Sequence, residues 1–133
     1  MSATTIAVWS VVQIPLAFAF LVLILNSAYL AARADASPFY FANVALHLVL
    51  GVALATAAAR RFARYRGPRP PLAVGAAVLL GAATALGLVL MVVGATRPYR
   101  WILHAHIATA VAGTVVLMLH AALQARRMSE RRS

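Results

Sequence analysis

Four long apolar stretches, separated by short polar breaks, are the feature that most limits how this chain can fold. They cover approximately residues 5–32, 39–59, 72–96 and 99–125. A helix needs about 20 apolar residues to cross a bilayer, and helices or closed barrels are what satisfy the backbone inside lipid. The sequence therefore predicts an all-α protein, an integral membrane four-helix bundle in which residues 1–133 form a single domain.

The composition narrows the chemistry that such a domain can perform. Of the 133 residues, 64% are hydrophobic and 11% are charged, and none is cysteine. Disulfides, thiolate zinc sites, iron–sulfur clusters and covalent haem attachment are therefore excluded. The carboxylate side chains are those of Asp35 and Glu130, both outside the apolar stretches. We therefore do not expect hydrolysis or transport driven by carboxylates within the membrane.

The positive charge lies at the ends of the apolar stretches and predicts a topology. The net charge is +10, and five arginines fall within residues 60–71. Arginines accumulate on the cytoplasmic side of membrane proteins, and the basic tail 126–132 agrees with that placement. We expect both termini to be cytoplasmic in a multi-pass protein of the cell (inner) membrane. Anionic lipid headgroups are the expected partners of these arginines, and nucleic acid is not.

Two histidines lie at similar depths within different apolar stretches. His47 is about 12 Å from the outer end of the second stretch, and His106 is about 10 Å from that of the fourth. Ionisable groups inside a membrane are costly and usually functional. Because two imidazoles at one level can bind the iron of a single haem b, His47 and His106 are the predicted ligands. The alternatives are polar contacts between helices and a proton-handling site.

Glycines accompany both histidines. Gly51 lies one turn after His47 on the same side, and the fourth stretch contains His106-x6-Gly113-x6-His120. Fourteen residues of helix return to nearly the same azimuth, so this pattern forms one stripe. A missing side chain allows a flat, bulky group to approach the backbone. Gly51 and Gly113 are therefore predicted cofactor contacts.

The two remaining histidines have less certain roles. His104 is about 160° around the helix from His106, so both cannot face the same pocket. It replaces His106 as ligand if that helix is rotated, or else lies at the outer interface or hydrogen-bonds a quinone. His120 would ligate a second, inner haem only with a partner that the sequence does not identify. Otherwise it lies at the cytoplasmic interface.

Polar residues near the outer ends complete the candidate site. Arg97 and Arg100, together with Arg33, could pair with haem propionates, or the first two could anchor at headgroups beside Tyr99 and Trp101. A separate polar group on the first stretch is expected to form hydrogen bonds between helices. Its members are Asn26, Ser27 and Tyr29.

The histidine pattern resembles that of small bacterial four-helix transmembrane cytochrome b subunits. In their two-haem forms, two helices each carry a pair of histidines separated by thirteen residues. His106 and His120 match one pair, and His47 matches half of the other, whose second position is Arg61. The resemblance implies an electron-transfer subunit rather than a stand-alone catalyst. It would act between the quinone pool and a dehydrogenase or c-type cytochrome outside the cytoplasm.

Two other hypotheses remain open. The protein could be a membrane scaffold or assembly subunit without haem, whose histidines hydrogen-bond to helices or lipids. It could also bind quinone or handle protons without its own haem, through His104 or His120. Haem content separates the first hypothesis from both of these.

Overall fold

The computed structural model describes the backbone of residues 3–33 and 37–130, with side chains from Pro15 onward. All regular secondary structure in these residues is helical. Its elements are α1 (Ala3–Ala32), α2 (Pro38–Arg64), α3 (Pro71–Val93), the short 3-10 turn η1 (Arg97–Tyr99) and α4 (Arg100–Glu130). All four α-helices are long and apolar enough to cross a membrane, and the predicted all-α class is confirmed for the described residues.

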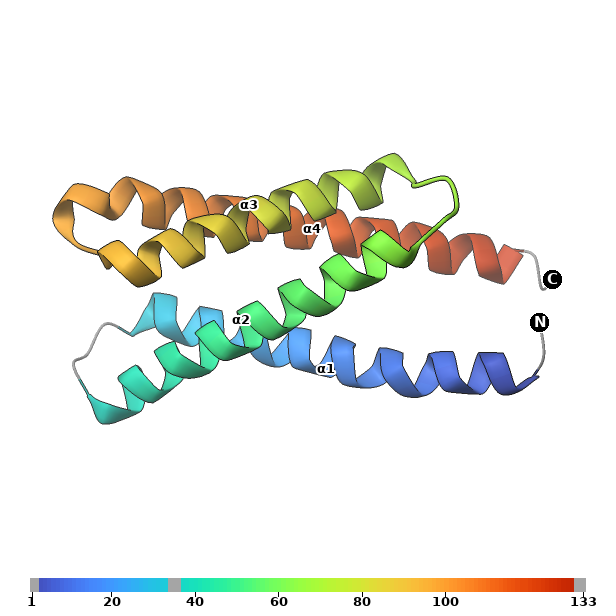
Figure 1. Ribbon diagram of the computed structural model, residues 1–133, viewed down its shortest axis with the longest axis horizontal. Coiled ribbons are helices and arrows are strands. Elements are labelled where there is room, and N and C mark those ends of the chain that lie inside the picture. Colours follow the sequence, from blue (N-terminus) through green and yellow to red (C-terminus); the bar gives the residue numbers. More distant parts are fainter. Residues whose placement is uncertain (1–2, 34–36, 131–133) are drawn as a thin grey trace. The chain divides into compact units, whose positions relative to one another are not determined.

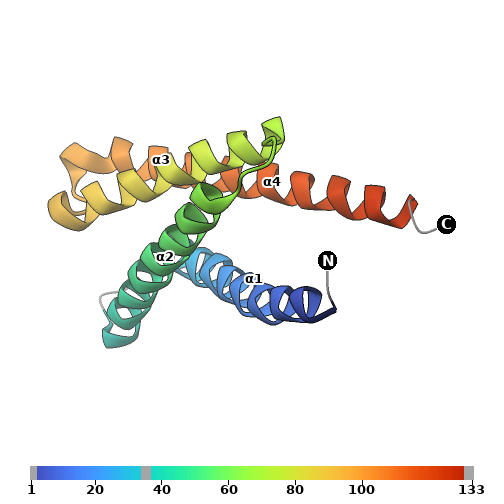
Figure 2. The ribbon, with the colours of Figure 1, turned by 45° about the vertical axis from the view of Figure 1, so that its right-hand side comes forward.

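The chain divides into two compact units, residues 1–64 and 65–133. Each unit is a helical hairpin, formed by α1 with α2 and by α3 with α4. Figures 1 and 2 show that α3 and α4 run antiparallel, side by side, whereas α1 and α2 cross and then diverge. A haem ligated by His47 and His106 would require one residue from each hairpin.

Local sequence explains where the helices begin and end. The backbone N–H of Tyr40 donates to Ser37 Oγ at 3.2 Å, so Ser37 caps α2, and Pro38 occupies the first helical position, where proline is favoured. Pro71 has the same place in α3. Gly94 ends α3 with a φ of 71°, a left-handed conformation that glycine adopts without steric cost.

Neither hairpin buries much of its own apolar surface. The buried residues are the small Ala76, Ala83 and Gly113, together with Ile102 and Asn26, and α2 has none. Large side chains such as Val92, 82% exposed, point outward. Water would make such a surface unstable, whereas lipid tails would solvate it. The exposure therefore agrees with a multi-pass membrane protein.

Candidate functional site

His47 is held in the first hairpin by a hydrogen bond from α2 to α1. Its Nδ1 lies 3.2 Å from Ser27 Oγ. The Ser27 hydroxyl donates its hydrogen to the Leu23 carbonyl at 2.7 Å, so its oxygen accepts from His47. This assigns the ring proton of His47 to Nδ1 and the lone pair to Nε2.

A second polar contact lies one helical turn from the first. Asn26 Nδ2 donates to Asn43 Oδ1 at 2.8 Å, and Asn43 Nδ2 donates to the Phe39 carbonyl at 2.8 Å. The rings of Tyr29 and Phe39 meet edge to face, 5.5 Å apart. These contacts fix the register of α1 against α2 at the level of His47. The predicted hydrogen bonds between helices are confirmed for Asn26 and Ser27, whereas Tyr29 contacts α2 through its ring.

Asn26 has a further property that sequence alone did not suggest. It is 6% exposed, the one buried polar residue among those described. Its Oδ1 has no hydrogen-bond partner in the described part of the chain. The Asn43–Phe39 bond fixes which end of Asn43 faces Asn26, so the Asn26 amide orientation follows from the network.

His106 is held in the second hairpin by the backbone of α3. Its Nδ1 lies 2.8 Å from the Ala83 carbonyl oxygen, which can only accept, so the ring proton is again on Nδ1. The ring packs against Gly87, where an added Cβ would lie 3.1 Å from Cε1 and 3.3 Å from Nδ1. Metal-binding histidines usually donate their second ring nitrogen to such a group. His106 and His47 therefore have the same tautomer, with the ring proton on Nδ1 and donated to an oxygen atom of the neighbouring helix.

The two predicted cofactor-contact glycines have different surroundings. A Cβ at Gly51 would meet nothing within 4 Å, so the space beside it, one turn after His47, is open. A Cβ at Gly113 would lie 2.8 Å from Leu80 Cγ and 3.1 Å from Leu79 Cβ. The absent side chain of Gly113 thus admits α3, and its contact with a cofactor remains a prediction.

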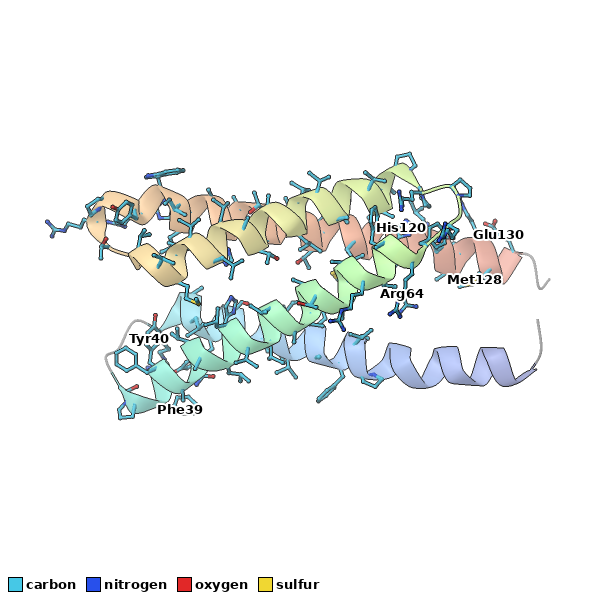
Figure 3. The ribbon with its side chains drawn as sticks, viewed as in Figure 1. Phe39, Tyr40, Arg64, His120, Met128 and Glu130 are labelled. Atoms are coloured by element: carbon cyan, nitrogen blue, oxygen red, sulfur yellow. The ribbon has the colours of Figure 1, made fainter. Side chains whose placement is uncertain are left out.

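The other predicted site residues have different surroundings from His47 and His106. His104 is exposed on α4, and His120 is half-buried where α4 passes the beginning of α3 (Figure 3). Arg33, Arg97 and Arg100 are all exposed. Arg100 begins α4, about 9 Å along the helix axis from His106.

His47 and His106 belong to different units, so their pairing remains a prediction. Measured from the observed helix starts, they lie about 14 Å and about 9 Å along α2 and α4. Sequence reasoning missed the groups that orient them, Ser27 as an imidazole partner and the Ala83 carbonyl. Ser27 could have been recognised as a partner because it is a polar residue within an apolar stretch. Nothing in the sequence indicates which backbone carbonyl a histidine reaches.

Two further observations bear on what the site could hold. Among residues 15–33 and 37–130, no three His, Cys, Asp or Glu side chains gather as a metal cluster would require. An apolar groove of about 480 Å³ also separates α1 from α2, beginning just beyond the level of His47 along α2. It is lined by Pro15, Leu16, Ala19, Leu50, Ala53, Leu54 and Ala57.

No family model, curated protein or solved structure matches this chain.

Proposed function

We propose that the protein is a b-type haem subunit of the cell (inner) membrane. It would relay electrons between the quinone pool and a redox partner outside the cytoplasm. The observation that carries the proposal is the matched state of two membrane-embedded histidines. His47 and His106 both place their ring proton on Nδ1, where Ser27 and the Ala83 carbonyl accept it. Both therefore present the lone pair of Nε2, as an axial haem ligand must.

The roles of the individual residues follow from these contacts. His47 and His106 would be the axial ligands, and their hydrogen bonds would set the plane and basicity of each ring. Haem, when bound, supplies a carrier for one electron. Gly51 offers open space beside His47, and the exposed Arg97, Arg100 and Arg33 could pair with propionates. Gly113 is better explained by helix packing.

The chain would act within a larger assembly and not as a stand-alone catalyst. Among the described residues, four membrane-length helices and short connections leave no separate substrate-binding domain. A dehydrogenase or c-type cytochrome is the proposed partner, with quinone as the small-molecule one. One haem is proposed, because no residue is assigned to pair with His120 for a second.

The decisive experiment is a reduced-minus-oxidised absorption spectrum of the detergent-purified protein, with haem quantified per chain. We expect one haem with a six-coordinate, low-spin spectrum. His47→Ala and His106→Ala should each lose it, whereas His104→Ala, at an exposed position, is the matched control and should retain it. If His104→Ala lost the haem and His106→Ala retained it, His104 would be the ligand in place of His106. Full haem in His47→Ala would contradict the proposal.

One observation favours a second candidate, the scaffold without haem. His47 and His106 each hydrogen-bond within their own hairpin, which is also how a histidine contributes to helix packing. Protein from haem-sufficient cells would then be colourless, and His47→Ala would lower its thermal stability without any spectral change. Colourless protein that retains quinone would instead indicate the quinone-binding subunit.

A further inference from the structure

A small hollow lies at the other end of the second hairpin, away from His106. It has a volume of about 130 Å³ and is formed where the last turns of α4 pass the beginning of α3. Its lining residues on α4 are spaced by three and four, so they share one helix face. The full lining is Pro70, Pro71, Leu72, His120, Leu123, Gln124 and Arg127.

The polar side of this hollow is cationic. Arg127 and Gln124 are exposed at its rim, and His120 is half-buried within it. Three further arginines of the same unit lie close in sequence to Pro70 or Arg127, namely Arg66, Arg69 and Arg126. Among the described residues of this unit, Glu130 is the one carboxylate side chain. The resulting positive potential favours an anion.

The beginning of α3 adds donors from the backbone. Pro70 and Pro71 have no N–H, and the Val74 N–H bonds to the Pro70 carbonyl at 3.1 Å. The N–H groups of Leu72 and Ala73 therefore have no acceptor within the helix, and no side chain caps this end. Leu72 and Arg127 both line the hollow, so the Leu72 N–H and the Arg127 guanidinium are donors suited to phosphate.

The apolar side of the hollow indicates where such a phosphate comes from. Leu72 and Leu123 line it, and Leu123 is 37% exposed, at the end of a hairpin long enough to cross a bilayer. A phospholipid headgroup lies at this level of a membrane, with its acyl chains along the apolar helix surface. A soluble phosphate would gain nothing from the leucines.

We propose that this hollow binds the phosphate of an anionic phospholipid, with Arg127 as its principal side-chain ligand and acyl chains along Leu72 and Leu123. The site is independent of the proposed haem, which would lie at the opposite end of α4. Basic pockets between membrane helices commonly select acidic lipids. Here the selectivity would come from one arginine at a defined position.

The test measures lipid binding to the detergent-solubilised full chain by native mass spectrometry. The probe is phosphatidylglycerol or phosphatidylcholine. Wild type should bind phosphatidylglycerol more tightly. Arg127→Gln should weaken that binding about tenfold, the loss expected for one charge-assisted hydrogen bond. Arg126→Gln removes the same charge from a residue that does not line the hollow, and should change binding less than twofold.

Other results would overturn the proposal. Equal losses in the two variants would mean that a diffuse charge, and not the hollow, attracts the lipid, and no loss in Arg127→Gln would remove the site altogether. Inorganic phosphate serves as the second probe. If it displaces phosphatidylglycerol at equal concentration, the ligand is a soluble anion. Unchanged helicity by circular dichroism and unchanged gel-filtration behaviour would show that both variants are folded.

Discussion

At the scale of single residues, the position of one proton decides what the two histidines can do. Ser27 Oγ accepts from His47 Nδ1 because its own hydrogen is donated to Leu23. Ser27→Ala should therefore weaken haem retention about tenfold to a hundredfold, the usual cost of removing the partner of a ligating histidine. Ser27→Thr keeps the hydroxyl and should retain most haem. Competition with imidazole, monitored by absorbance, measures haem retention in the two variants and in the wild type. Equal retention in these three proteins would contradict the assigned hydrogen bond.

A second prediction at this scale concerns the ring of His106. A Cβ at Gly87 would lie 3.1 Å from His106 Cε1, whereas one at Gly81 would meet nothing within 4 Å. Gly87→Ala should push the ring away from the Ala83 carbonyl and lower both haem content and the free energy of unfolding, the latter by about 1–3 kcal/mol. Gly81→Ala, on the same helix, should change neither. Unfolding in a mixed-detergent titration, with haem absorbance recorded alongside, tests the pair.

The sequence could predict only part of this residue-scale picture. Histidines in apolar stretches were visible as candidates, and polar Asn26 and Ser27 were correctly assigned to contacts between helices. Glycines were not distinguishable in this way, because Gly51, Gly81, Gly87 and Gly113 all lie in apolar helices. They differ in what lies opposite each of them: open space at Gly51 and Gly81, His106 at Gly87, and Leu80 at Gly113. These neighbours depend on the rotation and register of the helices.

At the scale of helices, the number of elements was predictable, and their ends were less so. Helix α2 continues to Arg64 and α4 to Glu130, beyond the expected ends at residues 59 and 125. Apolar stretches indicate where lipid begins, but arginine is a good helix former and is favoured in the last turn by the helix dipole. Helix α3 instead stops early, at Val93, because Gly94 adopts a positive φ.

Packing between α3 and α4 gives a prediction that belongs to this scale. Leu80 lies 2.8 Å from the position of a Cβ on Gly113, whereas a Cβ on Gly75 would make an ordinary 3.9 Å contact with Val116. Gly113→Ala should force the helices apart and cost about 1–3 kcal/mol in unfolding free energy, whereas Gly75→Ala should cost almost nothing. Reversible unfolding in a mixed-detergent titration compares the two. Equal costs would show that these helices do not meet at Gly113.

At the scale of the whole molecule, most of the described apolar side chains have no protein covering them. Small residues make up the buried set, and α2 buries none of its residues. The composition accounts for this outcome, because a chain with 64% hydrophobic residues cannot enclose them in two hairpins. Pairing of the hairpins was not predictable in the same way. It depends on which exposed faces meet in lipid, where apolar periodicity carries little information.

Orientation in the membrane is the last prediction, and arginine determines it. Nine of the twelve arginines lie in residues 60–69 and 126–132, and the other three, Arg33, Arg97 and Arg100, lie at or next to the opposite ends of the helices. The positive-inside rule therefore predicts that both termini are cytoplasmic and that the proposed haem lies near the outer face. Thr96→Cys should then react with a membrane-impermeant maleimide in intact cells, whereas Ser129→Cys should react only after lysis.

The chain is well suited to this experiment, because it contains no cysteine and the parent protein is an unlabelled control. Thr96 and Ser129 are both exposed, and Thr96 makes no side-chain capping bond, so neither change should disturb the fold. If Ser129→Cys were labelled in intact cells and Thr96→Cys were protected, the orientation of the protein in the membrane would be the reverse of the predicted one. The site at His47 and His106 would then face cytoplasmic donors, and the proposed extracytoplasmic partner would be wrong even if haem is present.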